Sequence, residues 1–496
     1  LYKTEDGTTK LGLKPIEHLD WKRVGIRYDE QGGTDKDGVM ELRPGVKDLD
    51  LGNSKYAQVR IGVGGTHYLK GMAVYGDPKD FPKGVDVIFN TNKKQGTPKE
   101  DVLKKLKDDP DNPFGAQIKP NGQKGAINKV NEEGDWGTWS KTLSSQFVSK
   151  QPPILVKGRI QKTYEKLQKE FDEIANLNNP VVRRIMMADF ANGLTTKRHN
   201  LKLTGFDRMR GQVLLPLSGI KANEIYAPNF KNGEKVVLVR YPHGGIFELP
   251  ELTVNNKLGN GPAKFMKGAK DAVGIDSSVA SKLSGADFDG DTVMVIPNNK
   301  NGIKTSRSLK ELKNFDTNQY YSPDKNILKR DSKGNWTIKQ KTMGEVSNLI
   351  TDMTLKGASQ SEIARAVKHS MVVIDAEKHN LDYKRSEREN DIPALKKKYQ
   401  DHYDVISGTI KNGASTLISR SKTEHRTLET WYKDRTPEEL AANPRLAPKI
   451  KKTKTISTDH VVEMVKDAKT LGSGTPIENM YGDYINALGK MRDKAN

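Results

Sequence analysis

The sequence predicts an α+β protein of 496 residues, with two β-rich segments separated by a helical segment and followed by a mainly helical region. Two changes of periodicity predict this class. Apolar and polar residues alternate in short stretches of 55–150, the period-two pattern of half-buried strands, and strand-like stretches return in 205–300. Between and beyond these segments the apolar residues recur at helical spacing. A chain this long exceeds the ~250–300 residues at which one hydrophobic core stops growing, so several domains are expected.

The pattern divides the chain into six segments. We expect an N-terminal extension with short strands, a first β-rich domain, a helical connector, a second β-rich domain, a helical region, and a basic linker that leads to a C-terminal helix. Their boundaries, in that order, are 1–54, 55–150, 151–204, 205–300, 301–432 and 433–496.

Each element follows from its local pattern. In the first β-rich segment, residues 57–63 and 85–89 alternate between glycine and proline residues that favour turns. The connector carries an apolar face along 157–175. The second β-rich segment predicts four strands, at 211–217, 235–240, 246–249 and 292–296. Apolar stripes beyond residue 340 predict helices, and a final helix is expected at 476–492.

Charge and composition limit the function classes. The 83 basic and 63 acidic side chains give a formal net charge of +20. This excess favours a polyanionic partner, because phosphates neutralised by Lys or Arg release counterions; solvated lysine-rich helix faces would account for it equally well. The absence of cysteine excludes disulfides, cysteine zinc ribbons and thiol catalysis. No run of ~18 apolar residues predicts a membrane span.

Three carboxylates alternate in the segment Asp287-Phe288-Asp289-Gly290-Asp291, directly before an apolar strand. Such carboxylates repel one another unless a cation lies among them. Alternate side chains of an extended segment point to opposite sides, but Gly290 lets the backbone turn so that all three converge. Converging hard oxygen ligands suit Mg²⁺. The segment therefore predicts a magnesium site made by Asp287, Asp289 and Asp291.

Three other interpretations of this acidic loop fit its residues less well. A calcium EF-hand loop needs Gly at its sixth and Glu at its twelfth position, where this chain has Thr292 and Asn298. A haloacid-dehalogenase-type phosphatase would use Asp289 as nucleophile, but its motif follows an apolar strand, and residues 282–285 are not one. An acidic surface turn beside a buried strand would be costly without a counter-charge. The metal site is the interpretation we favour.

The segment Ala286-Asp287-Phe288-Asp289-Gly290-Asp291 resembles the Asn-Ala-Asp-Phe-Asp-Gly-Asp signature of the RNA polymerase β′ subunit, with Gly285 in place of Asn. The resemblance implies a double-psi β-barrel at 205–300, in which Asp287, Asp289 and Asp291 hold the catalytic magnesium ion. Gly285 also makes the loop similar to that of the cellular RNA-dependent RNA polymerases of gene silencing, which begins Gly-Ser-Asp.

The segment 122–130, Gly-Gln-Lys-Gly-Ala-Ile-Asn-Lys-Val, resembles the β-subunit stretch Gly-Asn-Lys-Gly-Val-Ile-Ser-Lys-Ile at identical spacing. It implies a second double-psi β-barrel at 55–150 with Lys124 as a catalytic, substrate-contacting lysine. The family has another lysine upstream, and Lys119 is the nearest candidate, although its spacing is shorter. Lys129 and Lys70 are further substrate-binding candidates. For any single lysine in so basic a chain, a solvated side chain is the plain alternative.

Residues 239–243, Val-Arg-Tyr-Pro-His, resemble the β′ segment Asn-Arg-x-Pro-Thr-Leu-His, whose Arg contacts the nucleotide sugar. By that likeness Arg240 is a substrate-binding candidate, although Val239 replaces the Asn and the Thr-Leu pair is absent. The resemblance covers roughly 55–380 and does not extend to 1–54 or 380–496.

Taken as a whole, the resemblance implies β-like and β′-like halves in one chain: two double-psi barrels, a helical connector and a mainly helical C-terminal region. It implies RNA synthesis from ribonucleoside triphosphates by two-metal nucleotidyl transfer, with Mg²⁺ as cofactor. We expect a phage-type DNA-directed RNA polymerase. There are two alternatives. One is an RNA-directed RNA polymerase of the same fold, and the other is a catalytically inactive, polymerase-derived virion or nucleic-acid-binding protein.

The expected partners follow from that activity. They are a nucleic acid template, with DNA preferred to RNA, the RNA product and nucleoside triphosphates, possible further polymerase or virion subunits, and no membrane. A cytoplasmic location is expected, in the host cell if the protein is phage-encoded, or else packaging in a virion.

Overall fold

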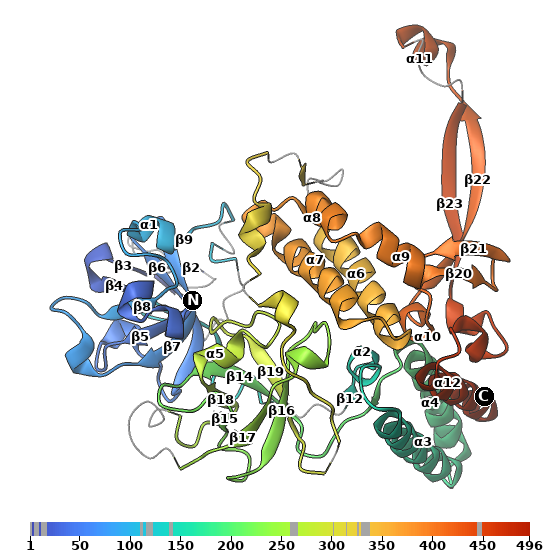
Figure 1. Cartoon of the computed structure of the whole chain (residues 1–496), viewed down its shortest axis with the longest axis horizontal. Coiled ribbons are helices and arrows are strands. Elements are labelled where there is room, and N and C mark those ends of the chain that lie inside the picture. Colours follow the sequence, from blue (N-terminus) through green and yellow to red (C-terminus); the bar gives the residue numbers. More distant parts are fainter. Residues whose placement is uncertain are drawn as a thin grey trace. The chain divides into compact units, whose positions relative to one another are not determined.

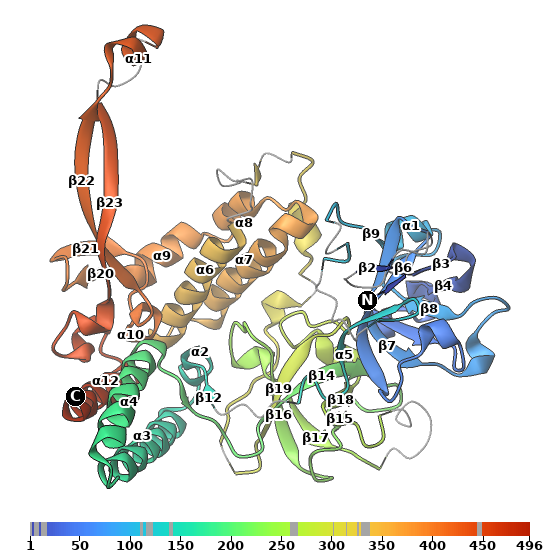
Figure 2. The ribbon, with the colours of Figure 1, turned by 180° about the vertical axis from the view of Figure 1, so that it is seen from behind.

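The structure is a computed structural model in which the chain forms two compact units (Figures 1 and 2). The first unit comprises Leu1–Lys141 and Phe206–Ser308, and the second comprises Thr142–Gly205 and Leu309–Asn496. The structure describes residues 2–3, 9–10, 17–109, 113–115, 123–137, 142–257, 266–300, 302–313, 315–324, 327–328, 338–443 and 449–496.

The first β structure of unit 1 is a nine-stranded sheet. Its strands follow the order β10-β11-β6-β7-β5-β8-β4, with β3 added to β6 and β9 added to β7. The bounds are β3 His18–Leu19, β4 Val24–Arg27, β5 Val39–Leu42, β6 Tyr56–Val63, β7 His67–Tyr75, β8 Val87–Asn90, β9 Lys104–Lys105, β10 Gln123–Lys124 and β11 Ile127–Glu132. The short helix α1 (Lys99–Val102) precedes β9, and β1 (Tyr2–Lys3) pairs with β2 (Thr9–Lys10).

The second β structure of unit 1 is a closed barrel of six strands in the order β14-β18-β15-β17-β16-β19. The bounds are β14 Arg210–Pro216, β15 Glu224–Tyr226, β16 Lys235–Val239, β17 Glu251–Val254, β18 Ala272–Ile275 and β19 Thr292–Pro297. The short helix α5 (Ser277–Ala280) lies between β18 and β19. The predicted α+β class is confirmed, and 205–300 forms a closed barrel as expected.

The two β structures share one strand topology, which no sequence repeat reveals. In chain order, the barrel strands are β14 to β19, and the matching sheet strands are β4, β5, β6, β7, β8 and β11. In both sets the first strand pairs parallel with the fifth, the fifth antiparallel with the second, and the second parallel with the fourth. The fourth then pairs antiparallel with the third, and the third antiparallel with the sixth.

One pairing distinguishes them. β19 pairs with β14 and closes the barrel, whereas the described residues include no pairing between β11 and β4. The shared topology makes the segment before β11 the equivalent of the segment before β19. The first holds Lys124 and the second holds the acidic loop, so the two motifs found in the sequence occupy matching positions of two similar halves.

The sheet begins earlier in the chain than the sequence predicts. Its strands β4 and β5 lie within 1–54, the segment expected to be a separate extension. Each pairs with β8 through backbone hydrogen bonds, which depend little on side-chain pattern. The four residues of β5 are all buried, including Glu41, which forms an ion pair with Arg27 (2.8 Å). Because Glu41 is charged although it is buried, the hydrophobic pattern of the sequence does not identify this segment as a buried strand.

A buried carboxylate ties the two β structures together. Asp271, which has no exposed surface, accepts hydrogen bonds from the hydroxyl of Tyr56 (2.8 Å) and from the backbone N–H groups of Gly134 (2.8 Å), Trp136 (2.7 Å) and Gly137 (3.0 Å). The donors follow β11 or begin β6, while Asp271 directly precedes β18. Apolar residues of the sheet, among them Tyr56 and Met72, also belong to the core cluster of the barrel. Unit 1 is therefore held by a shared core with a satisfied buried charge.

Unit 2 is mainly helical, as expected. Its longer helices are α3 Pro153–Ala175, α4 Pro180–Asn200, α6 Ile338–Leu355, α7 Gln360–His379, α8 Tyr383–Glu389, α9 Ile392–Gln400 and α12 Pro476–Ala495. Helix α12 packs on α3 and α4, and α6 packs on α7. Shorter elements are α2 Ser145–Val148, α10 Leu417–Arg420, α11 Pro437–Ala442, the strand pair β12 Thr142–Leu143 with β13 Leu203–Thr204, and the pair β20 Asp401–Asp404 with β21 Thr409–Asn412.

The segment predicted to be a basic linker instead contains most of a long antiparallel hairpin. β22 (Glu424–Asp434) pairs with β23 (Lys449–His460) along its whole length. Threonine alternates with lysine over residues 452–455 of β23, and β-branched threonine favours extended backbone. Its many lysines led the sequence analysis to predict a solvated linker. A two-stranded ribbon can also keep its lysines in water, because neither of its faces has to be buried.

No helix in the described part of the chain combines the length and the apolar character needed to cross a lipid bilayer.

Candidate metal and nucleotide centre

The acidic loop lies between α5 and the last strand of the barrel. Strand β19 has its inward residues Val293 and Val295 buried in the barrel core, so the loop is anchored at its C-terminal end. Phe288 is also buried in that core and anchors the loop at its middle. Gly290 has φ of +120°, a conformation that L side chains rarely adopt. The turn at Gly290 brings alternate side chains to one side, as the sequence predicts.

The three carboxylates converge. One oxygen from each of Asp287, Asp289 and Asp291 lies within 4.8 Å of the others. Backbone hydrogen bonds fix the arrangement: the N–H of Asp287 donates to Asp291 Oδ2 (3.0 Å), and the N–H of Asp289 donates to Asp287 Oδ1 (3.2 Å). The loop thus presents three acceptor groups to one point.

The sheet contributes a lysine to this point. Lys70, on β7, forms an ion pair with the carboxylate of Asp289. Its neighbour in register on β6 is Arg60, which in turn is in register with Asn128 on β11. Residues directly opposite in antiparallel strands share one face of the sheet. Lys70, Arg60 and Asn128 therefore form a polar row on the face of the sheet that carries the Asp289 contact.

Two further contacts hold the loop against the sheet. Gln58 Nε2 donates a hydrogen bond to the backbone carbonyl of Asp289 (3.1 Å). Gly38, just before β5, lies so close that a Cβ there would come within 2.9 Å of the Asp289 backbone nitrogen. A side chain at Gly38 would push the loop away from the sheet.

Arg240, directly after barrel strand β16, contacts the acidic loop. Its Nη2 lies 2.9 Å from Asp291 Oδ2. Its Nη1 donates to the backbone carbonyl of Ser284 (2.8 Å), at the start of the loop. Arg240 therefore belongs to the centre, where it holds the loop and neutralises one of its charges.

The electrostatics of the three carboxylates are unequal. Loss of water around its carboxyl group, with the negative charges of Asp289 and Asp291, raises the pKa of Asp287 to about 7. Burial acts in the same direction on Asp289, but the hydrogen bond and charge of Lys70 outweigh it and hold the pKa of Asp289 below its usual range. Such divergence among adjacent carboxylates is typical of functional sites.

Arg60 adds a second basic group behind Lys70. It is buried, and burial lowers the pKa of its guanidinium, while the negative charge of Asp289 acts in the opposite direction. Its Nη1 donates to the backbone carbonyl of Val59 (3.0 Å), and its Nε has no hydrogen-bond partner among the described residues. Arg60 thus contributes positive potential to the centre from inside the sheet.

The donor set fits Mg²⁺. All three side chains offer hard carboxylate oxygens, the ligands this ion prefers. Opposite ligands of an octahedral Mg²⁺ lie about 4.2 Å apart, from its 2.0–2.1 Å bonds. Adjacent ligands lie nearer, about 2.9 Å apart, so the three carboxylate oxygens, which lie within 4.8 Å of one another, would move closer together around the ion. One ion bound there would also relieve the mutual repulsion of the carboxylates.

The structure brings some predicted site residues to this centre and leaves others apart. Asp287, Asp289, Asp291, Lys70 and Arg240 meet there. Lys129 does not: its buried side chain forms an ion pair with Glu132 instead. It is in register with Val59 and Gly71, one residue away from the row that includes Lys70.

Lys124 and Lys119, the two lysines taken from the β-subunit likeness, are only partly described or not described by the structure. The backbone of Lys124 lies in β10, in register with Ile127 on β11, and that residue pairs with Ile61 on β6. The side chain of Lys124 and the whole of Lys119 lie outside the described residues. Their roles remain predictions from sequence.

Sequence reasoning missed Gln58, Arg60 and Gly38. The first two carried a signal: in β6 the apolar residues Ala57, Val59 and Ile61 alternate with Gln58 and Arg60. When the polar residues of an alternating strand have long, hydrogen-bonding side chains, the polar face of the strand can be a functional face and not only a solvated one. Gly38 carried no such signal, because its importance comes from a contact with a residue far along the chain.

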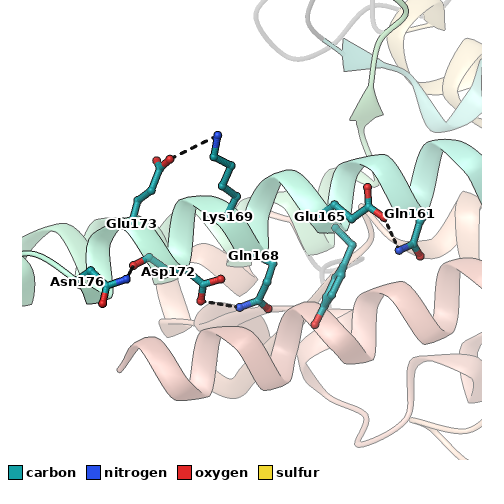
Figure 3. A pocket seen from close by; sticks show the side chains of 8 residues that line it. Gln161, Glu165, Gln168, Lys169, Asp172, Glu173 and Asn176 are labelled. Atoms are coloured by element: carbon teal, nitrogen blue, oxygen red, sulfur yellow. Dashed lines mark hydrogen bonds and ion pairs between the residues drawn. The ribbon is translucent and has the colours of Figure 1, made fainter.

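A shallow hollow on unit 2 has none of these features (Figure 3). It lies along α3, where the side chains satisfy one another at helical spacing: Gln161 donates to Glu165 (2.8 Å) and Gln168 donates to Asp172 (3.0 Å). These pairs are typical of a solvated helix surface. The hollow carries no functional assignment.

A scan against protein-family models and a search of curated proteins each return no match. Among solved structures, the chain is similar to an RNA dependent RNA polymerase, QDE-1 from Thielavia terrestris, at 13% sequence identity and a TM-score of 0.46. The aligned region covers 76% of this chain and 49% of that protein, so this chain spans about half of its length.

Proposed function

We propose that the chain is a two-barrel RNA polymerase that joins ribonucleotides at the centre formed by the acidic loop and the sheet. The observation that carries the proposal is the meeting of three converging carboxylates from one β structure with a lysine from its topological counterpart. Nucleotidyl transfer needs this combination, because metal ligands and cationic groups must surround the same phosphates.

The reaction follows from the charges. The 3′-oxygen of the growing RNA forms a bond to the α-phosphorus of a nucleoside triphosphate, the bond from that phosphorus to the bridging oxygen breaks, and pyrophosphate leaves; the hydroxyl proton passes to solvent. Mg²⁺ bound by Asp287, Asp289 and Asp291 would supply Lewis-acid activation of the attacking oxygen, and a second ion would enter with the triphosphate.

The chain's own basic groups have separate roles. We assign to Lys70 the stabilisation of negative charge on the transferred phosphoryl group, because its ammonium lies beside Asp289 and remains partly exposed. Arg240 holds the loop through Ser284 and Asp291. We also assign to its guanidinium a contact with the incoming nucleotide, from the β′ likeness. Lys124 and Lys119 are proposed phosphate contacts from the β-subunit likeness.

DNA-directed and RNA-directed synthesis would use the same centre. The groups at the centre recognise phosphates and a divalent cation, which DNA-directed and RNA-directed synthesis share. The phage-type likeness favours a DNA template, while the name of the similar solved structure specifies RNA-dependent synthesis. Both templates therefore belong in the same assay.

The phosphatase interpretation has no structural support. A haloacid-dehalogenase-type enzyme requires a parallel sheet with the nucleophile at the end of a strand, whereas Asp289 lies in a loop of a closed barrel with mainly antiparallel pairs.

The test is incorporation of labelled ribonucleotides by the full chain with Mg²⁺, on primed single-stranded DNA, duplex DNA and RNA in parallel. The wild type should extend at least one of them. Asp289→Asn should lower the rate by at least ~10³-fold, because it removes a metal ligand at the reacting centre. The matched control is Asp101→Asn, at an exposed acid on α1, which should leave the rate unchanged.

Two results would contradict the proposal. One is an Asp289→Asn chain as active as the control. The other is a folded wild type that is inactive on all three templates, which would favour the non-catalytic alternative, a polymerase-derived nucleic-acid-binding protein.

A further inference from the structure

The hairpin of β22 and β23, here called the ribbon, has a surface that the proposed centre does not use. It extends away from the helices of unit 2, and α11 lies at its tip (Figures 1 and 2). Its longer strand has 12 residues, which at ~3.3 Å per residue gives a length of about 40 Å. Two strands alone bury little, so this element contributes little to the stability of the unit.

The outer half of the ribbon is rich in lysine. Residues 429–434 pair with 449–454, and these twelve positions hold five lysines (433, 449, 451, 452 and 454) against two acids (429 and 434). One face carries Trp431 opposite Lys452, with Lys433 and Lys454 on neighbouring rows. Within the described part of the chain, neither Lys452 nor Lys454 forms an ion pair; both side chains are exposed.

Aromatic side chains accompany the lysines. Trp431 is 43% exposed and Tyr432 is 62% exposed, on opposite faces of the ribbon. Lysines alone on an exposed hairpin serve to prevent edge-to-edge aggregation. Exposed Trp and Tyr work against that purpose, because they add apolar surface. Their presence beside the lysines indicates a surface that binds something anionic with flat or apolar parts.

Nucleic acid meets both requirements, through its phosphates and its bases. We propose that the ribbon binds duplex DNA by entering the major groove. That groove is about 12 Å wide in B-form DNA and admits a two-stranded β-ribbon, whereas the major groove of A-form RNA is too deep and narrow. A groove position places Trp431 against base edges and thymine methyl groups, and lets Lys452 and Lys454 reach phosphates along the groove wall.

The binding test uses the full chain and a fluorescent 20-base-pair DNA duplex, without nucleotides or Mg²⁺, over a range of salt concentrations. The ribbon variant is Lys452→Gln with Lys454→Gln. Its control is Lys79→Gln with Lys169→Gln, which removes the same charge from two side chains that are 83% and 79% exposed elsewhere. Fluorescence anisotropy gives the affinity and its salt dependence for each chain.

The ribbon variant should bind the DNA about tenfold more weakly than the control, and the slope of log K against log salt should fall by about 2, since each lost phosphate contact removes ~0.9. Trp431→Ala should weaken binding by a similar factor without changing the slope, because the indole carries no charge. That difference separates an apolar groove contact from general electrostatics.

Three outcomes would overturn the proposal: a wild type that does not bind the duplex, equal losses in the ribbon variant and the control, or a larger loss on an RNA duplex of the same sequence. The ribbon inference does not depend on polymerase activity. The Asp289→Asn variant should bind the duplex as tightly as the wild type does. The binding test therefore gives an answer even if the chain has no polymerase activity.

Discussion

At the scale of single residues, the centre is defined by unequal charges in close contact. Lys70 lowers the pKa of Asp289, while the pKa of Asp287 is raised to about 7. The sequence identifies the three carboxylates because they lie within five positions of one another. It cannot rank Lys70 above Lys129, because both occur in strands and only the register of the sheet separates them.

Lys70→Gln should reduce kcat for nucleotide incorporation by about 100-fold, because the lost ammonium no longer offsets charge on the phosphoryl group. Binding of the template should change little. Lys79→Gln, which removes an exposed lysine of the same unit, serves as the control. Equal kcat values for the two variants would remove Lys70 from the centre.

Two glycines of the acidic loop test the need for close approach. Gly290 and Gly285 both have positive φ, so alanine strains the backbone at either position. Only at Gly290 would a Cβ collide, within 2.2 Å of Gln58 Nε2, whereas Gly285 faces open space. Gly290→Ala should therefore lower activity at least ~10-fold more than Gly285→Ala does, as a displacement of about 1 Å can cost 10²-fold. Similar losses would show that backbone conformation alone matters.

At the scale of elements, a few buried polar groups decide how strands and helices meet. Asp271 is not recognisable from sequence as such a group, since it precedes an ordinary apolar strand and its four donors lie far away in the chain. The ribbon was missed for a different reason. Its lysines and threonines have the composition of a solvated linker, and only backbone pairing between distant segments makes it a strand pair.

Asp271→Asn should loosen the segment 134–137, because one carboxylate oxygen accepts three of its N–H groups and an amide cannot replace all of them. Hydrogen exchange of the amides of Gly134, Trp136 and Gly137 should accelerate by about 10- to 100-fold, corresponding to ~1.5–3 kcal/mol for bonds to a charged group. Unchanged protection of these amides, relative to Asp101→Asn, would contradict this role.

His369 should make unit 2 sensitive to acid. The imidazole lies on α7, with Nδ1 3.1 Å from Ser386 Oγ, and burial lowers its pKa to about 4; Glu387 opposes the shift, and Lys396 and Lys384 add to it. The unfolded chain takes up the proton near pH 6.5, so the stabilisation is complete above that pH and is lost as the pH falls towards 4. The loss is about 3 kcal/mol at ~1.4 kcal/mol per pH unit.

Denaturant unfolding followed by helical circular dichroism between pH 7 and pH 4 measures this effect. His369→Gln should reduce the pH dependence, because glutamine has no titrating group. His402→Gln, at a partly exposed histidine of the same unit, is the control. An unaltered slope in His369→Gln would show that other groups govern the acid sensitivity.

At the scale of the whole molecule, unit 1 contains one topology used twice. The matching strand pairings place the segment with Lys124 and the acidic loop at equivalent positions, directly before the sixth strand. The sequence predicts both motifs and their order, since each is local. It does not predict the shared topology, because the two halves keep their pairing pattern without keeping a recognisable repeat.

The helical regions were predicted more readily than the first sheet. Amphipathic helices such as α3 carry their pattern within one segment, whereas strands such as β5 are defined by neighbours from other parts of the chain. The same distinction applies to the centre: its carboxylates come from one loop, and its basic and positioning groups come from four other strands or strand ends. Prediction from sequence succeeds where the chemistry is contiguous.

The central claim is that the acidic loop and the sheet surround one divalent cation. Replacing Mg²⁺ by Fe²⁺ and generating hydroxyl radicals locally cuts the backbone next to the bound ion, and mass spectrometry of the fragments locates the cuts. We predict cuts in both β structures, in 285–291 and around Gly38 and Lys70, which are suppressed by excess Mg²⁺ and absent in Asp289→Asn. Cuts confined to one β structure, or insensitive to Mg²⁺ and to that substitution, would contradict the account.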